Sequence, residues 1–166
     1  VVATDKTGTL TENRMDVRSL DVSDTSRALA AVVLANDADL STGAGDPLDL
    51  GLLRYAAAHG VDVARLREEH SLVDERLFDS AWRFARASVR KDGRLVSYVK
   101  GAPEAVFARC ALSGEDRDGW TGKAEAYAQE GFRVLAIAWG EGEAEERLTL
   151  LGLALCLAVL GFWSSA

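Results

Sequence analysis

Three short segments in the middle of the chain, each with a strand pattern, constrain the fold more than any other feature. Residues 72–78, 83–89 and 95–100 have the length and the β-branched and aromatic content of strands. Residues 91–93 (KDG) separate the last two segments, and an Asp-Gly pair is typical of a tight β-hairpin turn. The middle of the chain therefore predicts strands that pair in the antiparallel sense.

Helical patterns alternate with these segments. Asp46 is a suitable N-cap, Pro47 suits the first helical position and Asp49 favours the positive end of the helix dipole, so a helix is expected from here to His59. Further helices are expected over residues 26–36, 63–70, 101–110 and 123–129, and further strands over residues 1–5, 17–22 and 133–139. The pattern predicts an α+β fold, an antiparallel sheet flanked by helices and inserted after the first strand of another fold.

An almost wholly apolar stretch near the end of the chain allows two interpretations. Residues 148–163 are interrupted only by Thr149, Gly152 and Gly161. The stretch is as long as the shortest membrane-spanning helices, but it falls below the usual ~20 residues and no basic flank follows it. A buried strand accounts for the stretch at least as well.

Charge and cysteine content exclude some functions. The 166 residues carry 19 basic and 26 acidic side chains, and a net charge of −7 argues against a nucleic-acid partner. Cys110 and Cys156 lack the spacing of a zinc site or a disulfide framework, so buried thiols are expected. The acidic run at residues 141–146 is expected to be a solvated loop or a helix start. The length allows one domain, or a domain with part of another, and the opening inside a strand pattern suggests a piece of a longer protein.

Residues 5–11 (DKTGTLT) carry the clearest chemistry. Asp5 stands at the end of an apolar run, and a carboxylate there can attack phosphorus to form an acyl phosphate. Lys6, the backbone amides around Gly8 and a metal ion could neutralise the charge of a phosphoryl group in transfer. This combination predicts a phosphoryl-transfer site with Asp5 as its nucleophile.

All seven positions match the phosphorylation signature of P-type ATPases, and the chain resembles that family. The resemblance implies that Asp5 accepts the γ-phosphate of ATP to form an aspartyl-phosphate, with Lys6 and Thr7 as further catalytic residues. It also implies that the Asp5 carboxylate and the backbone carbonyl of Thr7 hold Mg²⁺, together with an aspartate from a later motif that this sequence lacks. The cofactors implied are thus ATP, as substrate, and Mg²⁺.

Four further runs resemble nucleotide-binding motifs of the same family. Residues 100–104 (KGAPE) match a family run, which implies roles for Lys100 and Gly101 in the ATP pocket. Phe78 resembles the aromatic residue that stacks on adenine, and Arg83 falls where the family carries a basic residue that contacts nucleotide. Trp82 is an alternative aromatic platform. The residues after Arg83 depart from the family pattern, so their alignment is open by one or two positions.

The other two runs contribute one acidic and one positively charged side chain. Residues 45–49 (GDPLD) resemble the family run GDPTE, which places Asp49 where a glutamate accepts a hydrogen bond from the adenine amino group. A helix-capping role for Asp49 is the alternative. Residues 131–136 resemble the run whose arginine meets the phosphates, which implies that role for Arg133.

The resemblance also implies a domain division. Residues 1–15 are expected to be part of a haloacid-dehalogenase-like phosphorylation domain, residues 16–147 the nucleotide-binding domain, and residues 148–166 a return strand with an atypical apolar tail. The chain is then the ATP-binding cytoplasmic portion of a cation-transporting pump of the plasma membrane. Its partners are the remaining phosphorylation, actuator and transmembrane domains, and the piece alone is expected to be inactive.

Two alternatives remain open at this stage. The first is a soluble haloacid-dehalogenase-like phosphatase or phosphotransferase that uses Asp5. Such enzymes often have a second aspartate two residues after the nucleophile, and Thr7 at that position counts against this alternative. The second is a degenerate, non-catalytic nucleotide-binding module. The transported ion cannot be inferred, because the residues that select it are expected in membrane helices outside this chain.

Overall fold

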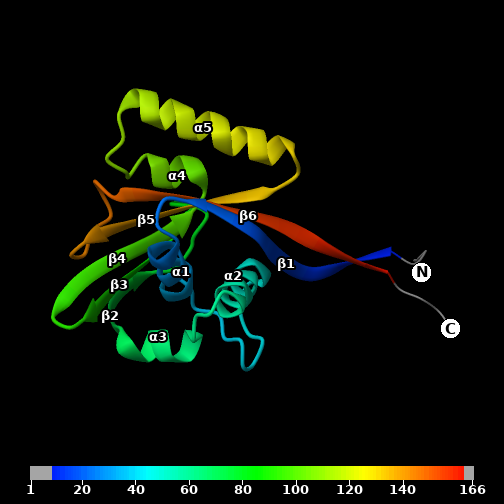
Figure 1. The fold of residues 1–166 in the computed structure, drawn as a ribbon, viewed down its shortest axis with the longest axis horizontal. Helices are drawn as coiled ribbons and strands as arrows, with labels where there is room; N and C mark the ends of the chain where they lie inside the picture. Colours follow the sequence, from blue (N-terminus) through cyan, green and yellow to red (C-terminus); the bar gives the residue numbers. More distant parts are fainter. Residues whose placement is uncertain (1–8, 163–166) are drawn as a thin grey trace.

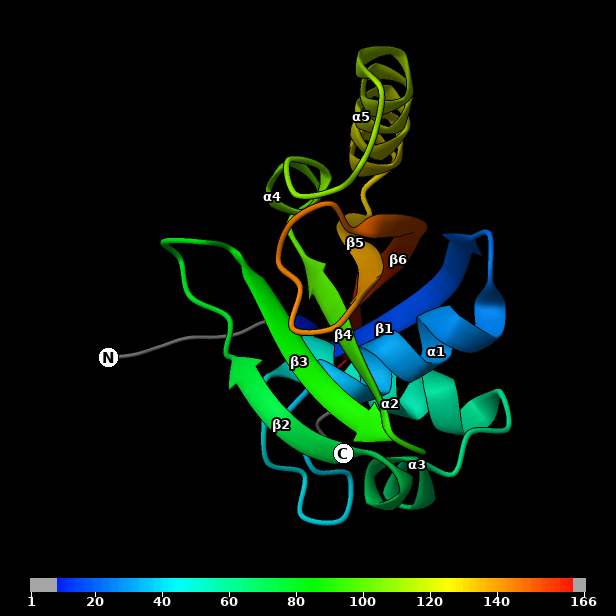
Figure 2. The same ribbon diagram turned by 90° about the vertical axis from the view of Figure 1, so that its left-hand side faces the viewer.

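The computed structural model describes residues 9–162, and it forms one six-stranded sheet with helices on both faces (Figures 1 and 2). The strands are β1 (Thr9–Val22), β2 (Ser71–Arg76), β3 (Phe84–Lys91), β4 (Arg94–Gly101), β5 (Arg133–Glu141) and β6 (Thr149–Phe162). The helices are α1 (Thr25–Leu34), α2 (Pro47–Ala58), α3 (Val63–Glu69), α4 (Pro103–Phe107) and α5 (Gly114–Gln129). The strand order is β1-β6-β5-β4-β3-β2, and every neighbouring pair is antiparallel. The predicted fold class is confirmed, while the expected strand at residues 1–5 lies outside the described residues.

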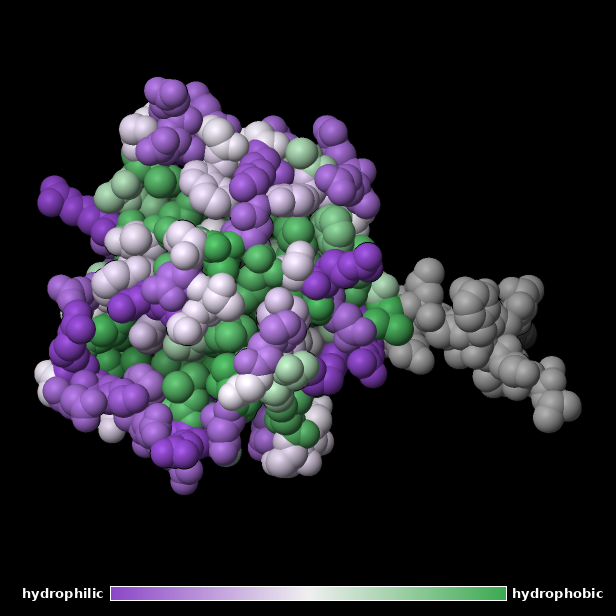
Figure 3. All heavy atoms as spheres, viewed as in Figure 1, coloured by the Kyte–Doolittle hydropathy of each residue, from purple (hydrophilic) through white to green (hydrophobic). Residues whose placement is uncertain are grey.

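The helices divide between the two faces of the sheet. Figure 1 shows α1, α2 and α3 below the sheet and α4 and α5 above it. Each face buries its own apolar cluster: α1 and α2 pack on one side through residues such as Val32 and Leu52, and α4 packs on the other through Phe107. Polar residues cover most of α5 and the periphery, while apolar residues are visible between the helices and over the sheet (Figure 3).

Local sequence signals account for the starts of the helices. Asp24, Asp46 and Asp62 cap α1, α2 and α3 by accepting a hydrogen bond from a backbone N–H in the first turn. Helix α5 begins nine residues before its expected start at Lys123, because Ser113 caps it. Three glycines among its first nine residues weaken the helical pattern of the sequence there.

The apolar stretch after Leu148 forms strand β6. Its first half lies between β1 and β5, and residues 151–156 there are buried on both faces, which accounts for the continuous apolar sequence of that part. A β-bulge at Leu151 and Gly152 switches the faces that its side chains occupy, since Leu151 packs with the α1 side and Leu153 with the α4 side. Gly152 has φ = +144°, and a Cβ there would lie 2.0 Å from the carbonyl oxygen of Asp21. Within residues 9–162, no helix is long and apolar enough to cross a membrane.

Strands β1 and β6 also form a two-stranded ribbon that extends from the rest of the sheet (Figure 1). Their pairing runs from Val22 opposite Gly152 to Thr9 opposite Phe162. The weak strand predicted over residues 17–22 is therefore the end of a longer one. The ribbon brings residue 9 beside residue 162.

Candidate functional site

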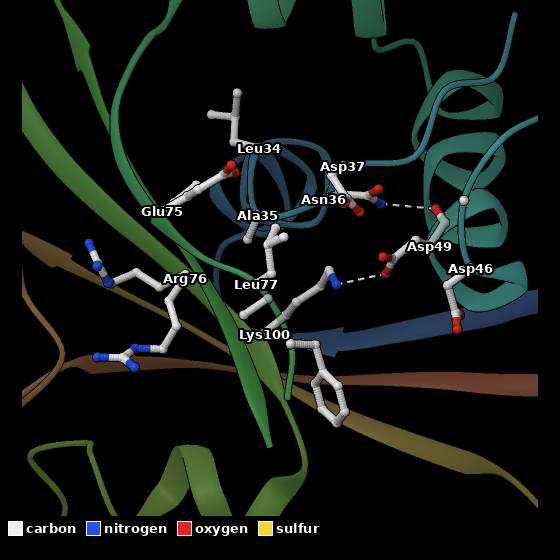
Figure 4. A pocket seen from close by; sticks show the side chains of 15 residues that line it. Leu34, Ala35, Asn36, Asp37, Asp46, Asp49, Glu75, Arg76, Leu77 and Lys100 are labelled. Carbon is white, nitrogen blue, oxygen red and sulfur yellow. Dashed lines mark hydrogen bonds and ion pairs between the residues drawn. The ribbon is translucent and has the colours of Figure 1, made fainter. Parts of the chain in front are cut away.

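A cavity of about 370 Å³ lies where the helical layer meets the edge of the sheet (Figure 4). The end of α1, the start of α2, the end of β2 with the turn after it, and strands β3 and β4 all contribute to its wall. Three of the residues named from the sequence, Asp49, Phe78 and Lys100, line this one cavity. They come from three separate elements, so the fold brings them together.

Lys100 and Asp49 form an ion pair inside the cavity. The ammonium Nζ of Lys100 donates a hydrogen bond of 2.7 Å to Oδ1 of Asp49. The two side chains are only 7% and 18% exposed. Figure 4 shows them pointing toward each other from β4 and α2. A buried pair of this kind offers both a hydrogen-bond donor and a charged acceptor to a ligand in the cavity.

The wall around Asp49 is held by hydrogen bonds that the sequence did not reveal. The side-chain amide nitrogen of Asn36 (Nδ2) donates to the backbone carbonyl of Asp49 at 2.9 Å (Figure 4) and to that of Val32 at 3.0 Å. Arg67, on α3, donates to the backbone carbonyls of Ala38 and Asn36 at 2.8 Å each. The turn after α1 is thereby fastened to α2 and α3. This arrangement fixes the position of Asp49.

Phe78 stands at the mouth of the cavity. It belongs to the connection between β2 and β3, and its side chain is 56% exposed. Aromatic rings are mostly buried in folded proteins. The ring of Phe78 is instead exposed, beside a cavity with a charged pair in its wall. The ring is therefore available to stack on a flat ligand.

Gly101 and Arg83 meet where β4 ends beside the start of β3. A Cβ at Gly101 would lie 2.5 Å from the carbonyl oxygen of Arg83 and 2.6 Å from Cα of Phe84. The close approach of two backbones requires glycine at this position. Arg83 itself has φ = +63° and forms an exposed ion pair with Glu104. Its side chain does not line the cavity.

Arg133 lies on the same face of the sheet as Lys100 but outside the cavity wall. Lys100 pairs with Ile137 across β4 and β5, and Arg133 is four residues before Ile137, so alternation places both cations on one face. Cys156 pairs with Arg133 and is buried beneath the two cations. Burial raises the pKa of the Cys156 thiol to about 12, although the positive charges of Arg133 and Lys100 act in the opposite direction.

On the other face of the sheet, an arginine cluster was missed by the sequence analysis. Arg86, only 7% exposed, bonds to Asp74 at 2.6 Å and to Glu145 at 2.7 Å, and Arg76 also bonds to Glu145, at 2.8 Å. Burial opposes the charge of Arg86, but the carboxylates outweigh burial and raise the pKa of the guanidinium. The hydrogen bond from Arg76 is the largest cause that lowers the pKa of Glu145. The one signal in the sequence was a charged residue in the interior of a predicted strand.

The residues predicted for catalysis lie outside the residues that the structure describes. Asp5, Lys6 and Thr7, named for catalysis and for Mg²⁺, fall within residues 1–8. The described part of the chain contains no cluster of three or more His, Cys, Asp or Glu side chains that could hold a metal ion. The nucleophile loop and the metal ligands thus remain predictions.

Comparison with known proteins supplies a family context for this cavity. The family model described as P-type ATPase, cytoplasmic domain N, matches residues 24–154. Calcium-transporting ATPase 1 of Lactococcus lactis is 32% identical over an alignment of 165 positions. The match covers 84% of this chain and 19% of that protein. A probable cation-transporting P-type ATPase of Mycoplasma genitalium is 33% identical over an alignment of 147 positions, and the match covers 83% of this chain and 16% of that protein. The chain thus spans about a fifth of the length of these curated relatives.

Proposed function

The chain belongs to the P-type ATPase cytoplasmic domain N family, and from this premise we propose that its cavity binds the adenine ring of ATP. The observation that carries the proposal is the exposed ring of Phe78 at the mouth of a cavity whose wall contains the Lys100–Asp49 pair. Stacking of a base on an aromatic ring contributes about 1–3 kcal/mol. Asp49 supplies an acceptor for the adenine amino group, and Lys100 supplies a donor for ring nitrogens.

The placement of cations supports a path for the phosphates. Arg133 lies on the face of the sheet that carries Lys100, outside the cavity, and it is exposed. An arginine fork suits phosphate oxygens, so we assign Arg133 to the phosphate chain. Arg83 lies beside the loop of Phe78 and already pairs with Glu104, so its contact with nucleotide requires that this exposed pair opens. Exposed pairs are weak enough for this exchange.

We further propose that Asp5 is the acceptor of the γ-phosphate in a full-length cation pump. An oxygen of the Asp5 carboxylate attacks the γ-phosphorus, the bond from that phosphorus to the bridging oxygen breaks, and ADP leaves with the electron pair. Lys6 neutralises charge on the transferred group. The Asp5 carboxylate and the backbone carbonyl of Thr7 would hold Mg²⁺, which would supply further charge neutralisation.

The proposal assigns each part of the chain to a part of such a pump. Residues 16–147 form the nucleotide-binding domain, residues 1–15 belong to the phosphorylation domain, and residues 148–166 return toward it. The phosphorylation, actuator and transmembrane domains are the partners, and the nucleotide-binding domain faces the cytoplasm. In a full-length pump, radioactive phosphate from γ-labelled ATP should form a hydroxylamine-sensitive bond that Asp5→Asn abolishes. Label that persists in this variant would remove Asp5 from the proposal.

Isothermal titration of this chain with ATP tests the nucleotide site. Phe78→Ala should raise the Kd for ATP by roughly tenfold, within the range that base–aromatic stacking allows. Leu72→Ala is the matched control, because Leu72 is 55% exposed in β2 and does not line the cavity. The control should bind as the wild type does. Equal affinity of Phe78→Ala and wild type would refute the assignment of the ring.

A further inference from the structure

We infer that Trp82 is a positioning residue that holds Phe78 at the mouth of the cavity, and that Glu145 controls Trp82 through Arg76. The inference rests on the proposed function, since it concerns the same base platform. It adds two things: a residue that fixes the platform, and a connection from the acidic loop between β5 and β6 to the nucleotide site.

The first step is the shape of the connection that carries Phe78. The indole Nε1–H of Trp82 donates a hydrogen bond of 2.9 Å to the backbone carbonyl of Leu77, the residue directly before Phe78. Two shorter-range bonds close the same loop: the backbone N–H of Ala81 donates to the side chain of Asp79 at 2.8 Å, and Arg83 N–H donates to the Asp79 carbonyl. Of these bonds, only that of the indole is made to the peptide group between Leu77 and Phe78.

The second step is what holds the indole. The guanidinium of Arg76 lies over the Trp82 ring, with its central carbon 4.7 Å from the ring centroid. A cation over an indole face is attracted by the π-system, and an arginine can also bond in its own plane while it stacks. Arg76 does so: its Nε and Nη2 donate to the two carboxylate oxygens of Glu145 at 2.8 and 3.0 Å. Glu145 therefore fixes the plane on which Trp82 rests.

The third step is the rigidity of Glu145. Its side chain is only 23% exposed, and Oε2 also accepts a hydrogen bond of 2.7 Å from the buried Arg86. Arg86 is in turn bonded to Asp74 at 2.6 Å. Because Arg86 belongs to β3 and Asp74 to β2, the carboxylate of Glu145 is tied to two strands of the sheet. The loop between β5 and β6 and the loop of Phe78 therefore share one fixed anchor.

The chain offers two selective variants. Trp82→Phe keeps an aromatic ring for Arg76 but removes the N–H that bonds to Leu77. Glu145→Gln removes the charge that orients Arg76 without any substitution at Trp82 itself. The matched controls are Trp120→Phe, on α5, and Glu141→Gln, an exposed acid at the end of β5 that pairs with Arg94.

The first measurement uses the chain without nucleotide. The sequence has four tryptophans, so a ¹H–¹⁵N spectrum resolves each indole N–H. Glu145→Gln should shift the Trp82 indole signal and the Leu77 and Phe78 amide signals, while Glu141→Gln leaves them in place. A Trp82 signal that Glu145→Gln does not move would overturn the connection through Arg76. A role confined to overall stability would not produce so local a shift.

The second measurement is the affinity for ATP. Both variants should raise the Kd roughly fivefold, which corresponds to about 1 kcal/mol, while both controls bind as the wild type does. If the wild type binds ATP and the two variants bind equally well, the positioning inference is wrong and the proposed function stands. If the wild type itself does not bind, the proposed function fails and the role of Trp82 fails with it.

Discussion

The ammonium of Lys100 lies 2.7 Å from a carboxylate oxygen of Asp49, and this contact joins β4 to the first turn of α2 across 51 residues of sequence. Both groups are largely buried, so each depends on the other for the solvation that it lost on folding. The pair is therefore both a structural connection and the charged wall of the proposed nucleotide cavity.

Removal of one partner should destabilise the fold markedly. Lys100→Met leaves the Asp49 carboxylate buried without its cation, and we expect the free energy of unfolding to fall by about 3 kcal/mol. Urea unfolding measures this change. Lys91→Met is the control, because Lys91 pairs with Glu69 at 3.6 Å on an exposed surface and should contribute less than about 1 kcal/mol. Equal losses in the two variants would contradict the account of a buried pair.

Gly152→Ala should disrupt the junction of β1 and β6. The new Cβ would approach the Asp21 carbonyl oxygen at 2.0 Å, and φ = +144° is unfavourable for alanine. Strain and overpacking together predict a loss of about 2–6 kcal/mol in the free energy of unfolding. Gly142→Ala separates the two effects, since Gly142 has φ = +74° but nothing within 4 Å of a Cβ. It should lose about 1–2 kcal/mol. A Gly152→Ala loss no larger than that of Gly142→Ala would show that the contact is absent.

Stability at acid pH should depend on Asp21, which ties α5 to β1. The hydrogen bond from Lys123 is the largest cause that lowers the pKa of Asp21, with a second hydrogen bond from Tyr127, while burial opposes both. Because the folded pKa lies below the ordinary value, the carboxylate contributes stability above the unfolded pKa. That contribution disappears as the pH falls through the folded pKa.

Asp21→Asn should therefore reduce the free energy of unfolding at neutral pH, and the difference from wild type should shrink as the pH falls below about 4. Urea unfolding between pH 7 and pH 3 follows the difference. A difference that stays constant over this interval would show that the ionised carboxylate is not what stabilises the contact.

Both cysteines should be unreactive in the folded chain. Burial raises the pKa of Cys110 and of Cys156 to about 12, so both thiols stay protonated and inaccessible at neutral pH. A thiol-specific disulfide reagent at pH 8 should label neither until urea unfolds the chain, and both thereafter. Rapid labelling of either cysteine under native conditions would contradict the described core.

Local signals predicted much of the fold. The Asp-Gly turn after β3 occurs as expected, with positive φ at Asp92 and Gly93, and β3 pairs with β4 across it. Asp46 and Pro47 start α2 as their positions predict. These features succeed because they depend on residues within one turn of each other.

The rest depends on contacts between distant residues. A charge inside a strand, such as Arg86, cannot be assigned a partner from the sequence, since Glu145 is 59 residues away. The apolar run of β6 was ambiguous because residues 151–156 are buried on both faces, and such burial removes the alternation that distinguishes a strand. Likewise, the sequence named Asp49 and Lys100 separately but gave no indication that they form a pair.

A titration of the ¹⁵N-labelled chain with ATP and Mg²⁺, followed by ¹H–¹⁵N spectra, tests the central claim most directly. The account predicts saturable shifts for the amides of Asn36, Asp49, Phe78 and Lys100, and little change along α5. A folded spectrum that ATP does not alter, or shifts that gather away from the cavity, would contradict it.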